Sequence, residues 1–80
     1  MPVDGPDDRR RDLTPAHVRE RADVVEVMFA ESPRIFRLFR SHADFDRLSS
    51  ALRASLAAGR AVRVTLTVPH GGDIADVQVL

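Results

Sequence analysis

Three histidines are the first candidates for chemistry in this chain, because histidine is the usual acid–base group and metal ligand near neutral pH. They are His17, His42 and His70, and no two of them stand at the spacing of an HxH or HExxH motif. A zinc site needs three or four converging ligands, and the chain has no cysteine to supply thiolates. We therefore expect no metal and no cofactor.

The acidic and hydroxyl side chains give no catalytic pattern either. Asp44 and Asp46 stand two positions apart in a helical segment, where side chains diverge by roughly 200° and cannot act as a pair. The serines lack the sharp turn that exposes a nucleophile. The two glycines in Pro69–Asp73 lie between two strand-like segments, which is typical of a hairpin turn and not of a phosphate loop. The sequence predicts that the protein is not an enzyme.

Arginine is the one chemically distinctive residue type. All twelve basic residues are arginine and they balance twelve acidic residues, a composition typical of GC-rich genomes and in that sense bacterial-like. Residues 34–60 contain six arginines but only two aspartates, with phenylalanines interleaved. This local excess suggests nucleic-acid binding as the alternative function. The contacts would be Arg34, Arg37, Arg40, Arg47 and Arg53.

The first part of the chain is expected to be a tail followed by a short helix. Residues 1–13 are polar, mixed in charge and contain too little apolar surface to order, so they are predicted to be a disordered tail. Thr14 followed by Pro15 is typical of a helix start, and a short helix is expected to about Ala22. Residues 14–80 would then form a single α+β domain.

The rest of the sequence predicts a hairpin, a helix and a second hairpin. Segments 24–29 and 34–40 are interpreted as strands, although 34–40 as a helix would give a winged-helix-like order. Segments 62–68 and 74–80 alternate in polarity, with a bulge allowed in the second. We expect one four-stranded antiparallel sheet in the order β-β-α-β-β, packed on one main helix.

The main helix is predicted over residues 42–58. Ser41 would cap its beginning, with an acid three residues later, and Gly59 suits a left-handed cap at its end. The buried stripe would consist of Phe45, Leu48, Leu52 and Leu56.

Size and polarity suggest a role in protein–protein contact. A folding unit of roughly 60–70 residues without disulfides is marginal on its own, so we expect self-association as a homo-oligomer. The hairpin 24–40 has apolar residues on both faces, more than one helix can cover. The sequence thus predicts a non-catalytic interaction or regulatory accessory module, with a surface formed by Val24, Met28, Ile35 and Phe39. The chain has no apolar run of about 20 residues and no signal-like N-terminus, so a cytoplasmic location is expected.

Overall fold

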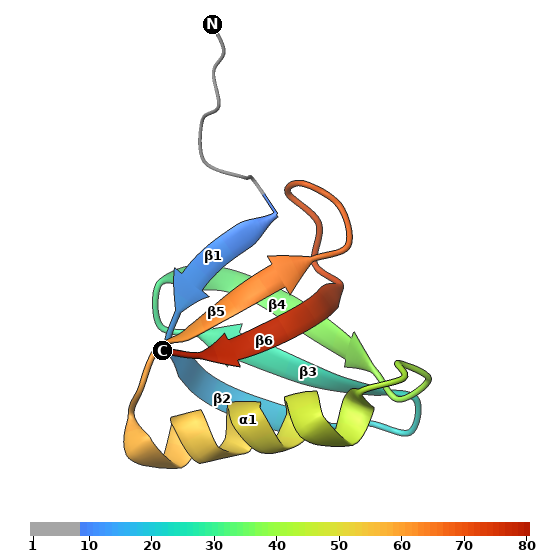
Figure 1. The fold of residues 1–80 in the computed structure, drawn as a ribbon, viewed down its shortest axis with the longest axis horizontal. Helices are drawn as coiled ribbons and strands as arrows, with labels where there is room; N and C mark the ends of the chain where they lie inside the picture. The colour runs from blue at the N-terminus through green and yellow to red at the C-terminus, as the bar shows by residue number, and fades with distance from the viewer. Residues whose placement is uncertain (1–8) are drawn as a thin grey trace, which may run out of the picture.

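The computed structural model describes residues 9–80, which form six strands and one helix (Figure 1). In chain order the elements are β1 (Arg10–Leu13), β2 (Pro15–Glu20), β3 (Val24–Phe29), β4 (Ser32–Phe39), α1 (Phe45–Ala58), β5 (Val62–Leu66) and β6 (Ile74–Val79).

The strands form two three-stranded antiparallel sheets, in the orders β1-β5-β6 and β2-β3-β4. Only Thr14 separates β1 from β2, so the chain passes directly from the first sheet into the second. On another side, the Arg37 N–H donates to the Gly72 carbonyl over 2.7 Å, which ties β4 to the beginning of β6. The helix α1 runs along the lower side of the two sheets in Figure 1 and packs against β2, β4 and β6.

The predicted single four-stranded sheet packed on one helix is therefore wrong, although the class α+β holds. The two sheets bury their inner faces against each other, and α1 adds its apolar stripe to the same core. The fully buried side chains come from all three layers: Val25, Val27, Phe36, Leu38, Leu48, Leu52, Val62 and Val64 are at most 1% exposed. Alternation along β3 and β5 identified their buried faces, but it carries no information on which strands pair, because pairing depends on distant contacts.

The predicted short helix at residues 14–22 is also wrong, because this segment is β2. Its supposed cap, Thr14, donates its N–H and its hydroxyl to the Glu31 carboxylate, at 2.7 and 2.8 Å. Pro15 stands at the beginning of a strand at the edge of its sheet, where a missing N–H is tolerated. Val18 lies opposite Val27 in the ladder with β3. Tertiary hydrogen bonds thus override a local signal that fitted a helix start.

The predicted disordered tail over residues 1–13 is wrong for its last four residues. Residues 10–13 form β1, whose Leu13 is only 4% exposed, while residues 1–8 of the predicted tail lie outside the described residues. Asp12 forms two hydrogen bonds with the Arg63 guanidinium, at 2.8 and 3.1 Å, across the ladder to β5. The buried Leu13 and the Asp12–Arg63 ion pair help to hold β1 in place. The polar composition of this segment gave no indication of a strand.

The predictions for 34–40 and for the last hairpin are closer to the structure. Residues 32–39 form the strand β4, so the winged-helix-like alternative is wrong. The expected bulge in the last strand is confirmed: Thr65 pairs with Asp76 and Leu66 with Ile74, which leaves Ala75 as the extra residue.

The main helix is confirmed, but it begins at Phe45, three residues later than expected. The residue at its N-cap is Asp44, which makes no side-chain cap hydrogen bond, so the predicted cap at Ser41 is wrong. Instead, His42 holds this corner: its Nδ1 accepts the Asp44 N–H at 2.9 Å, and its Nε2 contacts the Ala75 carbonyl oxygen at 2.7 Å. The segment before α1 is therefore tied to β6.

Gly59 ends α1 in the left-handed conformation, with φ of 67°. A Cβ at this position would meet no atom within 4 Å, so replacing the glycine changes the backbone energy alone. We expect Gly59→Ala to lower the free energy of unfolding by about 1–2 kcal/mol, measured by urea denaturation. Gly59→Asn is the matched control and should cost less, because asparagine tolerates this conformation. An alanine variant as stable as the wild type would contradict the left-handed cap.

Candidate interaction surface

The four residues of the predicted interaction surface lie together on the outer face of the β2-β3-β4 sheet. In the ladder between β3 and β4, Val24 is opposite Phe39 and Met28 is opposite Ile35, and residues opposite each other share a face. Met28 is 36%, Ile35 51% and Phe39 38% exposed, while Val24 is partly buried. We call Val24, Met28, Ile35 and Phe39 the outer-face patch.

A row of charged side chains crosses the outer-face patch. Arg19, Glu26 and Arg37 are opposite one another on β2, β3 and β4, between the Met28–Ile35 pair and the Val24–Phe39 pair. The Arg37 guanidinium lies 5.7 Å from the centre of the Phe39 ring and forms an ion pair of 3.0 Å with Asp73. The patch is thus two small apolar areas separated by a polar row.

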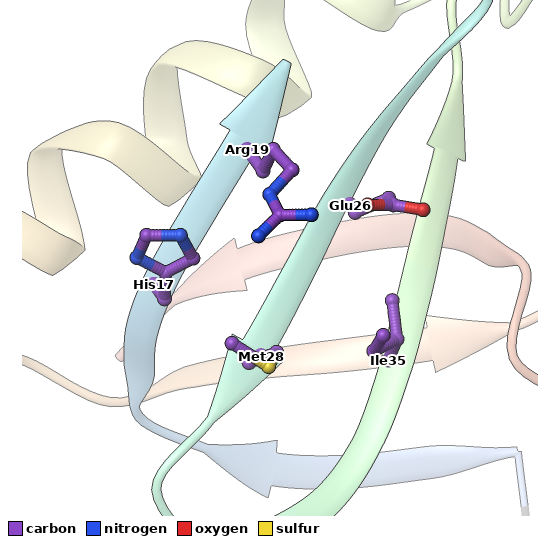
Figure 2. A pocket seen from close by; sticks show the side chains of 5 residues that line it. All are labelled: His17, Arg19, Glu26, Met28 and Ile35. Atoms are coloured by element: carbon purple, nitrogen blue, oxygen red, sulfur yellow. The ribbon is translucent and has the colours of Figure 1, made fainter. Parts of the chain in front are cut away.

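The Met28–Ile35 half of the patch is hollowed. A shallow depression of about 50 Å³ is lined by His17, Arg19, Glu26, Met28 and Ile35, which come from all three strands of the sheet (Figure 2). Figure 2 also shows the strands of the other sheet behind this one, so these side chains project away from the core. Small-molecule sites usually enclose roughly 300–1,000 Å³. The depression is therefore better suited to one side chain of another protein.

The sequence interpretation missed His17 and Arg19 as part of this face. Both were assigned to a helix, whereas in β2 they lie opposite Met28 and Glu26. Among residues 16–20 of this strand, the apolar residues are the exposed Ala16 and the partly buried Val18. With only one large apolar side chain in the segment, the alternation that is typical of a strand was too weak to indicate one.

The five arginines predicted to contact nucleic acid do not form one surface. Four of them form ion pairs: Arg37 with Asp73 at 3.0 Å, Arg40 with Glu20 at 3.1 Å, Arg47 with Asp76 at 3.1 Å, and Arg53 with Glu20 at 2.6 Å. The guanidinium of the fifth, Arg34, lies 5.8 Å from the centre of the Phe36 ring. The ion pairs of Arg47 and Arg53 connect α1 to both sheets. Most of the predicted positive patch is thus neutralised within the fold.

Three carboxylates have a pKa lowered by their hydrogen bonds and nearby positive charges. Hydrogen bonding to Arg63 lowers the pKa of Asp12, and the Arg40 guanidinium, followed by the charge of Arg53, lowers the pKa of Glu20. The backbone N–H of Thr14 is the main cause of the lowered pKa of Glu31. All three carboxylates therefore favour their ionised form when the protein is folded.

This arrangement predicts a loss of stability in acid. Because the folded pKa values of Asp12, Glu20 and Glu31 lie below the ordinary values of 3.8 and 4.5, the unfolded chain takes up protons first. The contribution is complete above those values and is lost as the pH falls through the folded ones. The urea concentration at the midpoint of unfolding should therefore decrease as the pH is lowered from about 6 to about 2.5. Glu31→Gln should make the fall shallower, and a flat profile would contradict the ion pairs.

The described residues offer no metal site. Within residues 9–80, no group of three or more His, Cys, Asp or Glu side chains is close enough together to hold a metal ion. His17 lies on the outer face, His42 is held by its backbone contacts, and His70 stands in the turn before β6 with φ of 61°. In this same part of the chain, no helix is long and apolar enough to cross a membrane.

The fold, two three-stranded sheets with one helix across them, has counterparts among solved structures. A crystal structure of pro-protein-glutaminase matches 90% of this chain with a TM-score of 0.77 and 16% identity, and a mutant of that protein matches 86% with a TM-score of 0.76 and 16% identity. This chain spans about a quarter of those chains, 26% and 24%. No protein-family model and no curated protein matches. At this identity the likeness shows the fold alone.

Proposed function

We propose that this protein is a small, non-catalytic module that binds another protein through the outer-face patch. The observation that carries the proposal is the position of Met28, Ile35 and Phe39: three large apolar side chains, each at least 36% exposed, on one face of two hydrogen-bonded strands. Clustered exposed apolar side chains are typical of protein-binding surfaces, and methionine, phenylalanine and arginine are enriched there. The rigid ladder beneath them keeps the entropic cost of binding low.

The comparisons support a regulatory form of this proposal. Both similar structures are of an enzyme in its pro-form, and the part that resembles this chain is about a quarter of their length. In those chains, the part with this fold is joined to a longer remainder, whose surface it can contact. By analogy, the partner of this protein would be an enzyme or its precursor, and binding would alter that enzyme's activity.

The proposal is tested by comparing the proteins that copurify with four forms of the chain from its source cells. The wild type and Val79→Asp should retain at least one common partner, and Ile35→Asp and Met28→Asp should lose it. Val79 is the matched control because it is 54% exposed on β6, in the other sheet, against 51% for Ile35. A partner retained equally by all four forms would contradict the proposal.

Self-association through the same patch is measured separately, by light scattering during size-exclusion chromatography. A dimer that Ile35→Asp dissociates and Val79→Asp does not would identify the partner as a second copy. Nucleic acid that copurifies with the wild type and is lost from an Arg34→Glu variant would instead favour the nucleic-acid alternative. Cell fractionation tests the cytoplasmic location that we retain as part of the proposal.

A further inference from the structure

The depression in the outer face has an arginine at its edge that the fold leaves unpaired. In the part of the chain that the structure describes, Arg19 forms no ion pair, whereas the neighbouring arginines do: Arg21 with Glu26 at 3.3 Å and Arg37 with Asp73 at 3.0 Å. Figure 2 shows the Arg19 side chain reaching from β2 across towards β3, above the sheet. Its guanidinium is thus available beside the depression.

The floor of the depression is apolar. Met28 and Ile35 lie opposite each other on β3 and β4 and provide it, and both are exposed. A space of this size receives one large apolar side chain rather than a whole small molecule. Methionine adapts its shape to different apolar partners, which suits a surface that accepts a side chain from outside.

The charge around the depression is positive. Three arginines (Arg19, Arg21 and Arg37) stand against two carboxylates (Glu26 and Asp73), which leaves an excess of one positive charge. A second copy of this chain would bring the same positive excess against this face. An acidic partner gains from the same charge, because complementary potentials favour association.

Resting on the proposed function, we infer that the outer-face patch binds a protein segment with a large apolar side chain next to an aspartate or glutamate. The apolar side chain occupies the depression over Met28 and Ile35. The carboxylate pairs with the Arg19 guanidinium, whose forked donors match a carboxylate in two parallel hydrogen bonds. The apolar anchor supplies affinity and the arginine selects acidic over basic segments.

The test is selection of a random-peptide phage library against immobilised wild-type protein, followed by fluorescence anisotropy with the best synthetic peptide. We expect enriched peptides in which a Leu, Phe, Ile or Met has Asp or Glu within two positions. Ile35→Asp and Arg19→Glu should each weaken the peptide by about tenfold or more. The matched controls Val79→Asp and Arg60→Glu make the same changes outside the outer face and should bind like the wild type.

The outcomes separate this inference from the proposed function. Peptides that are apolar without acidic neighbours, or basic, and that bind Arg19→Glu as well as the wild type would overturn the inference and leave the interaction surface intact. A selected peptide insensitive to Ile35→Asp, or no enrichment over a blank surface, would overturn both. A further supporting result is a peptide affinity that falls with added salt for the wild type and is salt-independent for an Arg19→Gln variant.

Discussion

Replacing Phe36 by alanine is expected to unfold most of the protein at room temperature. Phe36 is 1% exposed between the two sheets, and its ring packs edge-on against Phe29 with the ring centres 5.2 Å apart. Removing a buried phenylalanine side chain costs about 3–5 kcal/mol, which is about all the stability that a domain of this size commonly has. Circular dichroism and urea denaturation measure the loss.

Phe39→Ala is the matched control for this variant, because it removes the same side chain from the same strand. Phe39 lies on the outer face and is 38% exposed, so its loss should cost less than about 1 kcal/mol. Equal destabilisation by the two variants would contradict the orientation of β4, and with it the division between the core and the outer-face patch.

Ile35→Asp is expected to weaken partner binding strongly and leave the fold intact. Because the side chain is 51% exposed and faces away from the core, the free energy of unfolding should change by about 1 kcal/mol or less. The aspartate would place a carboxylate beneath the docked apolar side chain, where binding removes its water, so binding should weaken by about tenfold to hundredfold. Calorimetry with the captured partner measures the affinity.

The Val79→Asp variant separates this effect from a general effect of charge. Val79 is 54% exposed on β6, and aspartate there should have the same small effect on stability without any effect on binding. If Ile35→Asp unfolded the protein, the outer face would be part of the core of the fold. If both variants bound normally, the binding surface would lie elsewhere.

The segments with one buried face were predictable from the sequence because their alternation reflects local geometry. Val62–Leu66 shows this pattern, as does the run Val25, Val27 and Phe29 that identified the hairpin. The helix was found from its apolar spacing and from Gly59. In each of these segments, the apolar residues recur at the period of the strand or helix that the segment forms.

The N-terminal strands and the division into two sheets were not predictable for a physical reason. β1 has one buried residue, Leu13, and is held by pairing with β5 about fifty positions away. The segment at β2 begins with Thr14 and Pro15, which fit a helix start until Glu31 accepts the Thr14 hydrogen bonds. Such contacts connect distant parts of the chain, and a local sequence pattern cannot predict them.

For the candidate site too, features that depend on local pattern could be expected, and those that depend on distant contacts could not. The exposure of Met28, Ile35 and Phe39 could be expected from the sequence, because the hairpin has apolar side chains on both of its faces and one face had to remain outside the core. Their role in binding stays a prediction. Arg19 and His17 were missed with the strand that carries them. The ion pairs of the arginine cluster could not be foreseen, since its positions are close in sequence but their partners, such as Glu20 and Asp76, come from other elements.

The most direct test of the binding surface is an NMR titration of ¹⁵N-labelled wild-type protein with the selected peptide. Chemical shifts should change for the amides of Arg19, Met28, Ile35 and their neighbours on β2, β3 and β4, and should stay constant along β1 and β5. Changes confined to β1, β5 and β6, or spread over α1, would show that the outer face of the β2-β3-β4 sheet does not bind the partner.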